Sequence, residues 1–252
     1  MDADGVRVVL KCVQSQPLSL RVTERMQDTR RPQEALHHLP RQLHTLDMGC
    51  CFAVTDVSAL GGLHTLTMFH CNGVTDVSML GGLHTLHIGA CRGVTDVSAL
   101  GGLHTLDMCH CIRVTDVSAL GSGNLHTLNM SHCHQVTDVS ALGGLRMLDI
   151  SGCDGVTDVS ALGGLHTLDM RFCSNVTDVS MHGGLHRLDM SGCKGVTDVS
   201  ALGSGNLHTL HMNWCEGVTD VSMLGGLHTL SINHCRKVTD VSMLGGLHTL
   251  VR

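Results

Sequence analysis

Histidine and cysteine are the residues of this chain whose types and spacing suggest chemistry. The 252 residues include 20 His and 13 Cys. From residue 43 onward, one column of the sequence holds His44, His64, His84, His104, His126, His166, His186, His208, His228 and His248, a row interrupted by Arg146. Imidazoles at such spacing (the His ladder) suggest a metal-binding or pH-responsive surface. The alternative is an exposed residue that was copied when the repeat duplicated.

A second column, seven residues after the first, is cysteine. It comprises Cys51, Cys71, Cys91, Cys111, Cys133, Cys153, Cys173, Cys193, Cys215 and Cys235 (the Cys ladder). We interpret these thiols as small buried fillers that donate weak hydrogen bonds to loop backbone. An odd total with periodic spacing does not fit a secreted disulfide framework, so we expect thiols in a reducing, intracellular compartment, cytoplasmic or nuclear.

Other chemistry is less well supported by the pattern. The irregular cluster of Cys109, His110 and Cys111 with 132–134 contains soft ligands suited to Zn²⁺, but the ladder cysteines in it should point inward. An aspartate column from Asp56 to Asp240 is interpreted as local caps rather than as Ca²⁺ ligands. Catalysis needs one differentiated constellation, whereas Ser, His and Asp here are all columns. We therefore expect no metal, no cofactor and no enzyme.

The elements that position these columns come from a repeat of 20 residues. Ten units begin at Leu43, Leu63, Leu83, Leu103, Leu125, Leu145, Leu165, Leu185, Leu207 and Leu227, and a partial eleventh begins at Leu247. Positions 4 and 6 of each unit are apolar, and the residue between them at position 5 is polar. This alternation predicts a short strand. Positions 1, 9, 12, 15 and 18 complete a core one layer thick. Successive strands then stack in parallel, with turns or 3₁₀ pieces on the return path.

The motif also carries a family resemblance. Residues 145–158, LRMLDISGCDGVTD, resemble the cysteine-containing leucine-rich repeat, and the overlapping residues 156–162, VTDVSAL, are similar to the second half of internalin-type repeats. The resemblance implies an α/β-type solenoid, a curved leucine-rich repeat with a parallel β-sheet on its concave face. No F-box precedes the repeats, so an adaptor role in a ubiquitin ligase is not carried over. Residues 43–252 are predicted to be the solenoid, and residues 1–42 a partly helical N-terminal cap, with 17–38 at helical spacing.

Charge and hydropathy limit the partners. Formal net charge is −6, with a net −8 over residues 43–252, which argues against nucleic acid because phosphate binding needs clustered Lys and Arg. No apolar run approaches the roughly 18 residues of a membrane span. The sequence ends on an open repeat, from which we expect possible self-association.

Variation between copies indicates where a partner binds. Positions 12–16 are the same in all ten units, whereas positions 5, 7, 8, 10 and 11 vary. Position 5 lies between two inward residues, so its side chain should face solvent on the sheet, and positions 7 and 8 follow at the strand end. All four aromatic residues, Phe52, Phe69, Phe172 and Trp214, fall in variable positions. Aromatic and Arg residues are frequent interface anchors.

These patterns predict a non-catalytic scaffold that binds a protein partner through the concave face and its rim. The predicted partner-binding residues are Asp47, Phe69, His87, Asp107, Asp149, Asp169, Arg171, Phe172, Asp189, His211 and Trp214. Two alternatives stay open at this point: a metal- or pH-responsive surface on the His ladder, and a recently expanded repeat protein without a selected ligand.

Overall fold

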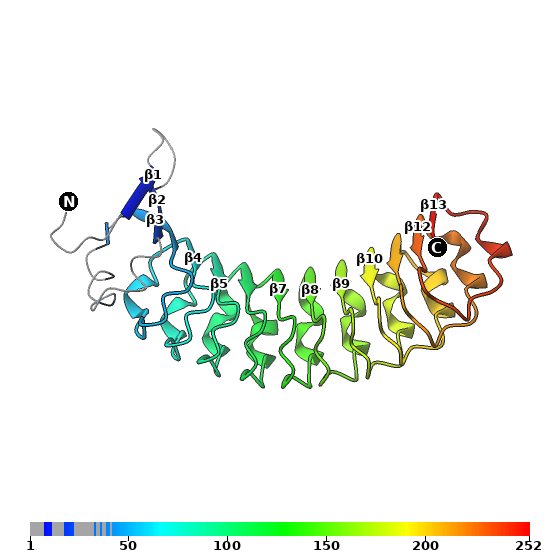
Figure 1. Cartoon of the computed structure of the whole chain (residues 1–252), viewed down its shortest axis with the longest axis horizontal. Helices are drawn as coiled ribbons and strands as arrows, with labels where there is room; N and C mark the ends of the chain where they lie inside the picture. The colour runs from blue at the N-terminus through cyan, green and yellow to red at the C-terminus, as the bar shows by residue number, and fades with distance from the viewer. Residues whose placement is uncertain (1–7, 12–17, 23–32, 34–35, 37–38, 41) are drawn as a thin grey trace. The chain divides into compact units, whose positions relative to one another are not determined.

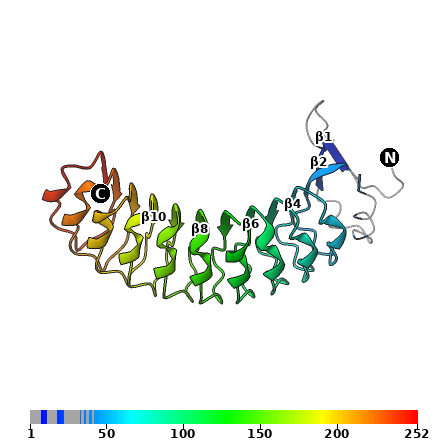
Figure 2. The same cartoon turned by 180° about the vertical axis from the view of Figure 1, so that it is seen from behind.

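A computed structural model describes residues 8–11, 18–22, 33, 36, 39–40 and 42–252. The chain forms two compact units, an N-terminal unit of residues 1–125 and a C-terminal unit of residues 126–252, and each is described by itself. Within both units every repeat makes one turn of a coil, with a short strand on one side and a 3₁₀ element on the other (Figures 1 and 2).

The strands of the N-terminal unit form a continuous ladder. They are β1 (Val8–Lys11), β2 (Leu18–Val22), β3 (Leu43–Asp47), β4 (Thr65–Thr67), β5 (Thr85–His87) and β6 (Thr105–Asp107). The β1–β2 pair is antiparallel, and every later pair is parallel, with each strand residue opposite its counterpart from β3 onward. The 3₁₀ elements are η2 (Ser58–Leu60), η3 (Ser78–Leu80), η4 (Ser98–Gly102) and η5 (Ser118–Ser122).

The C-terminal unit repeats the same arrangement with parallel pairing from β7 to β13. Its strands are β7 (Thr127–Asn129), β8 (Met147–Asp149), β9 (Thr167–Asp169), β10 (Arg187–Asp189), β11 (Thr209–His211), β12 (Thr229–Ser231) and β13 (Thr249–Val251). Its 3₁₀ elements are η6 (Ser140–Gly144), η7 (Ser160–Gly164), η8 (Ser180–Gly184), η9 (Ser200–Ser204), η10 (Ser222–Gly226) and η11 (Ser242–Leu244). The predicted parallel sheet with 3₁₀ pieces on the return path is confirmed.

The core consists of the seven aliphatic or thiol positions that the repeat predicts. In the repeat that begins at Leu145, for example, the side chains at these positions are all buried, from Leu148 and Ile150 through Cys153 to Leu162. Each layer is one side chain deep, so it is covered only by the layers before and after it. Leu, Val, Ile, Met and Cys side chains fill these layers, with His182 as an exception in the C-terminal unit.

Two backbone features close the coil. Position 19 is a glycine in all ten full repeats, and a Cβ on Gly225 would overlap the carbonyl oxygen of Met243 in the next repeat. Position 14 ends the loop before the 3₁₀ element, where Oδ1 of Asp220 accepts a hydrogen bond from the Ser222 N–H at 2.8 Å. The same bond recurs along the aspartate column, which confirms the predicted capping role.

The N-terminal region differs from its prediction. A helical spacing was expected over residues 17–38, but residues 18–22 form β2, which pairs in parallel with β3. A strand there satisfies the otherwise open backbone groups of β3, which a helix would not do. Most of the remaining residues of this region lie outside the described residues, and the boundary at residues 42–43 stays a prediction. No helix in the described part of the chain is long and apolar enough to cross a membrane.

Candidate binding surface on the sheet face

Position 5 occupies the outer face of each sheet, as expected. Positions 4 and 6 are buried on either side of it, so its side chain stands on the opposite side of the strand (the sheet face, with position 3). The side chains there are half-buried by their neighbours along the ladder, such as Asp169 at 24 % and Asp189 at 16 % exposure. The predicted residues at this position therefore line a continuous face within each unit.

In the C-terminal unit, four of the predicted residues form one charged cluster. The Arg171 guanidinium is bidentate on Asp169, with Nε to Oδ1 at 2.9 Å and Nη2 to Oδ2 at 2.8 Å. Its Nε also lies 4.0 Å from Oδ2 of Asp189. The ring of His211 adds a contact from Nδ1 to that same oxygen at 3.5 Å. Arg171 is thereby held against two carboxylates while 44 % of its side chain stays exposed.

The electrostatics of this cluster follow from burial and from the Arg171 bonds. Burial raises the pKa of Asp169, and the hydrogen bonds from Arg171 only partly oppose it. Those same bonds raise the pKa of Arg171, so its charge is fixed. The negative charge of Asp149, on the adjacent strand β8, also raises the pKa of Asp169. The arrangement is one guanidinium held among several carboxylates rather than an acid–base pair.

The predicted residues of the N-terminal unit are more scattered. Arg21 on β2 pairs with Asp47, with Nε to Oδ2 at 3.0 Å. The ring of His87 lies 3.8 Å from a carboxylate oxygen of Asp107. Burial acts to raise the pKa of Asp107, but hydrogen bonds from His87 and Cys109 outweigh it and leave the pKa below its ordinary value.

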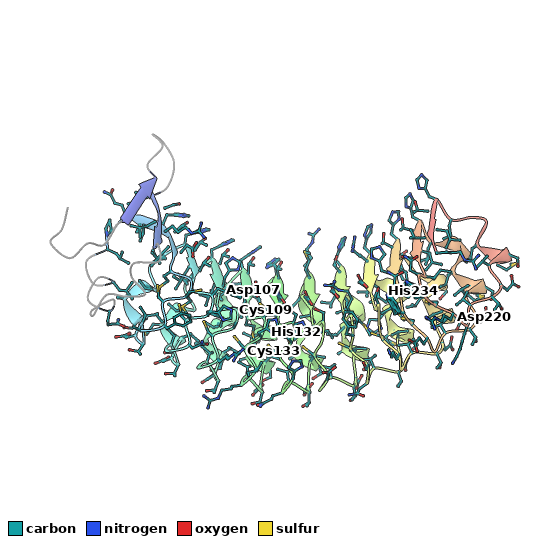
Figure 3. The ribbon with its side chains drawn as sticks, viewed as in Figure 1. Asp107, Cys109, His132, Cys133, Asp220 and His234 are labelled. Carbon is teal, nitrogen blue, oxygen red and sulfur yellow. The ribbon has the colours of Figure 1, made fainter. Side chains whose placement is uncertain are left out.

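A structural role for position 5 was missed by the sequence reasoning. Wherever an Asp or Asn stands there, its Oδ1 accepts the backbone N–H of position 7, as from Asp149 to Ser151 at 2.8 Å. Asp107 and Cys109, both labelled in Figure 3, make the same contact at 3.0 Å. This bond turns the chain at the strand end. The signal was present, because six of the ten units carry Asp or Asn at that position.

Three exposed aromatic residues lie at the strand ends, on the rim of the sheet face. Phe172 is 59 % exposed, Trp214 is 45 % exposed and Phe69 is 39 % exposed. Trp214 stacks on His234 of the next repeat, with ring centroids 3.7 Å apart. The rings of Phe172 and Phe69 lie over Gly192 and Gly89, since a Cβ on either glycine would come within 2.7 Å of the ring.

A second missed feature is the backbone of position 8, which carries Phe172 and Trp214. Its φ is between +57° and +63° at eight non-glycine residues, and the two glycines, Gly152 and Gly192, are also positive. This left-handed conformation costs about 1 kcal/mol or more for an ordinary residue. The strand end thus directs the position 8 side chain along the rim at a fixed angle.

The two ladders differ in accessibility. Eight of the Cys ladder thiols donate to the carbonyl oxygen of position 6 in the preceding repeat, as from Cys153 Sγ to Met130 at 3.1 Å, whereas Cys51 donates to Gly49 of its own repeat. Burial raises the pKa of Cys71 and Cys111 to about 12, so these thiols stay protonated. No disulfide joins any of the described cysteines. The His ladder, in contrast, is largely exposed, and its rings stack along the start of the strands.

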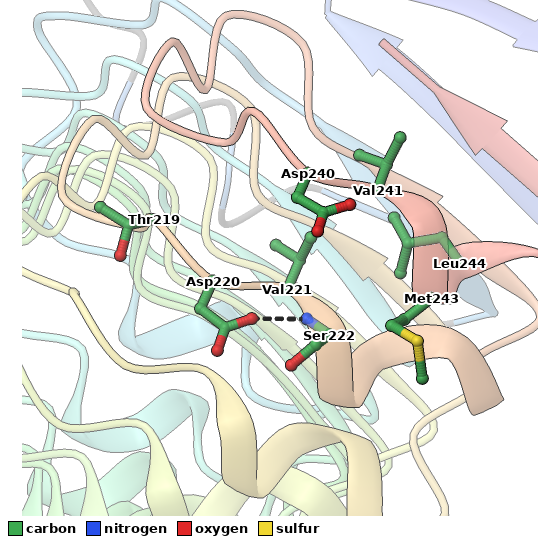
Figure 4. Close-up of a pocket in the computed structure, with 8 residues that line it drawn as sticks. All are labelled: Thr219, Asp220, Val221, Ser222, Asp240, Val241, Met243 and Leu244. Atoms are coloured by element: carbon green, nitrogen blue, oxygen red, sulfur yellow. Dashed lines mark hydrogen bonds between the residues drawn. The ribbon is translucent and has the colours of Figure 1, made fainter.

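The side with the 3₁₀ elements has shallow depressions between successive repeats. One of about 360 Å³ is lined by Thr219, Asp220, Val221, Ser222, Asp240, Val241, Met243 and Leu244 (Figure 4). The equivalent residues line further depressions between other repeats of the C-terminal unit. These depressions therefore follow from the repeat and are not one differentiated site. In the described part of the chain, no three His, Cys, Asp or Glu side chains are grouped so as to hold a metal ion.

Comparison with known proteins agrees with this architecture. No protein-family model matches the chain, and no curated protein matches its sequence. Among solved structures, internalin C2 from Listeria monocytogenes is similar at 23 % identity and a TM-score of 0.51, covering 83 % of this chain and 80 % of that chain. The leucine-rich-repeat domain of the type III effector XopL has 18 % identity and a TM-score of 0.51, covering 69 % and 70 %. The leucine-rich-repeat protein LegL7 from Legionella pneumophila has 11 % identity and a TM-score of 0.51, covering 92 % and 89 %.

These similarities define the class of protein by its fold. The chain is a leucine-rich-repeat solenoid with an internalin-like repeat, as its motif resemblance predicted. At these identities the likeness concerns the fold alone.

Proposed function

We propose that this chain is a non-catalytic scaffold that binds a protein partner through the sheet face and its rim. The observation that carries the proposal is the group of Arg171, Phe172 and Trp214 in the C-terminal unit. These anchor-type side chains are exposed at positions that vary, whereas the residues that build each turn are repeated. Leucine-rich-repeat neighbours are consistent with an interaction role.

Charge and geometry support the same surface. Arg171 is held by Asp169 and Asp189, so little side-chain entropy is lost when a partner contacts it. In the C-terminal unit, the proposed surface also includes Asp149, Asp169, Asp189 and His211. In the N-terminal unit, it consists of Asp47, Phe69, His87 and Asp107. The proposal assigns no catalytic role, because the titratable residues recur as columns without a differentiated cleft.

The test is affinity capture with the full chain, quantified by mass spectrometry across matched variants. Trp214→Ala and the pair Arg171→Ala with Phe172→Ala should weaken partner binding by more than about 1 kcal/mol, or about fivefold. The control, Ala161→Ser, changes an exposed residue on η7 and should leave affinity unchanged. Equal losses from both sides of the coil would contradict the proposal. If the chain captures no partner selectively, the result would favour the alternative that this is a recently expanded repeat protein without a selected ligand.

We further infer a reducing, intracellular location. Ten regularly spaced thiols serve as core fillers and backbone donors, a use that disulfide formation would destroy. Thiol labelling of native protein should reach the half-buried Cys50 and Cys109 first and the ladder cysteines last. Recovery of disulfides between ladder cysteines from native protein would overturn this assignment. Self-association through β13, where Leu250 and Val251 are exposed, stays a prediction.

A further inference from the structure

The His ladder has a geometry that protein binding on the sheet face does not use. In the C-terminal unit, successive rings from His166 through His186, His208 and His228 to His248 stack with centroids 4.8, 5.0, 4.3 and 4.4 Å apart. In the N-terminal unit, the rings from His44 to His104 stack at 4.3, 4.5 and 4.6 Å. All are within 20° of parallel.

One nitrogen of most of these rings is already engaged. Nδ1 lies 3.2 Å from the hydroxyl of the following threonine, as between His228 and Thr229 and between His248 and Thr249. His64 and His84 have the same contact at 3.1 and 3.2 Å. When Nδ1 donates its proton to the hydroxyl oxygen, the lone pair is on Nε2. Metal-ligating histidines are oriented by this kind of partner on their other nitrogen.

We propose that neighbouring rings of the His ladder bind divalent transition-metal ions that prefer imidazole nitrogen, such as Ni²⁺, Cu²⁺ and Zn²⁺, two rings to each ion. Tetrahedral ligation at about 2.0–2.1 Å places two nitrogens about 3.3 Å apart. Rings stacked at 4.3 to 4.4 Å reach that separation, with both Nε2 lone pairs directed at the ion, when the exposed side chains rotate about χ1 and χ2 out of the parallel stack. Water completes the coordination, so no cluster of three protein ligands is required.

The spacing ranks the sites within the C-terminal unit. His208, His228 and His248 are closest together, whereas the spacings on either side of His186 are 4.8 and 5.0 Å. His186 is also followed by Arg187 in place of threonine, which removes the Nδ1 partner and adds a positive charge. Arg146 breaks the row before His166. The strongest site of this unit is therefore assigned to His228 with its two neighbours.

The test uses Ni²⁺ with the full chain at pH 7.4, followed by isothermal titration calorimetry. Cys12, Cys50 and Cys109, the three cysteines outside the Cys ladder, are changed to Ser in every sample so that their thiols do not compete. The buried ladder thiols stay protonated. His228→Gln leaves both tight pairs of the C-terminal unit incomplete and should weaken the strongest site of that unit about tenfold or more. The matched control, His134→Gln, removes an exposed imidazole outside the ladder, which contacts Asp154 at 3.6 Å, and should leave that site unchanged.

A second measurement does not depend on any variant folding. Paramagnetic Ni²⁺ added to the parent chain should broaden the imidazole signals of the His ladder before those of His134 and His211. Unchanged affinity in His228→Gln, an equal loss in His134→Gln, or broadening that begins outside the ladder would each overturn the proposal. None of these outcomes bears on partner binding by Trp214, so the two proposals fail independently.

Discussion

At the scale of the residue, the rim of the sheet face depends on pairs that complement each other across repeats. Position 8 requires a left-handed backbone, and Gly192 adopts it with φ +79°. The same glycine lies beneath the Phe172 ring, where a Cβ would approach Cδ1 to 2.6 Å. Glycine at residue 192 therefore allows both the positive φ and the close approach of the Phe172 ring.

Gly192→Ala should destabilise the protein by about 1–2 kcal/mol, because alanine is strained at positive φ. It should also displace the Phe172 ring. Adding Phe172→Ala should recover the part of the loss that comes from the ring contact but not the backbone cost. Urea unfolding of both single variants and the double variant measures this coupling.

Gly144→Ala is the control for that experiment. Gly144 has no atom within 4 Å of an added Cβ, so alanine there should be neutral or slightly stabilising. If Gly192→Ala is as stable as Gly144→Ala, the left-handed turn and the ring placement are both refuted.

At the scale of the element, η8 is the weak turn of the C-terminal unit. His182 stands at position 18, where the other full repeats have leucine, and it is completely buried. Its Nδ1 lies 3.2 Å from the Val179 carbonyl oxygen, but Nε2 is buried without a hydrogen-bond partner. Met181 does not turn inward to compensate, since 61 % of its side chain is exposed.

His182→Leu should stabilise the protein by about 1–3 kcal/mol, because it removes an unsatisfied buried polar atom and restores an aliphatic layer. Hydrogen exchange, which we expect to be fastest among interior repeats over residues 165–206, should slow there in the variant. Met181→Leu, an exposed change on the same element, should have little effect. A neutral or destabilised His182→Leu would contradict the assignment of position 18 to the core.

The same residue predicts a pH dependence. Burial lowers the pKa of His182 below the ordinary histidine value near 6.5. The unfolded chain therefore binds a proton at this residue before the folded chain does, and stability falls as pH drops below about 6.5. Unfolding free energies measured from pH 7 downward should show a growing advantage of His182→Leu over the parent chain. If the difference in unfolding free energy between His182→Leu and the parent chain stays constant over that pH range, the predicted pH dependence is refuted.

At the scale of the whole molecule, charge selects against polyanionic partners. The formal net charge is −6, and the repeat region is more acidic than the chain as a whole. In the C-terminal unit, the exposed Arg171 lies against the carboxylates of Asp169 and Asp189.

We therefore expect no measurable binding of a short labelled DNA duplex at pH 7.4 and about 0.15 M salt. Fluorescence anisotropy of the duplex, titrated with the full chain, checks this. Binding that weakens steeply as salt is raised would show a phosphate-contacting surface and would contradict the expectation.

The repeat pattern was enough to predict much of this architecture. Position spacing predicted the strand, the seven buried positions and the aspartate caps, because identical turns in register place each residue type in the same environment. Exposure of Phe172 and Trp214 was predicted in the same way, from their place at variable positions. Partner-binding roles for those residues remain a proposal.

Other features required the folded chain. The strand at 18–22 was missed because its pairing with β3 overrides a local helical spacing. Left-handed φ at Phe172 or Trp214 has no signature in residue type, since the surrounding hydrogen bonds impose it on whatever residue stands there. Ring contacts, such as His228 on His248 or Phe172 over Gly192, join residues twenty positions apart through chosen rotamers. Local sequence cannot specify such contacts, because they exist only after stacking brings adjacent turns within one strand spacing.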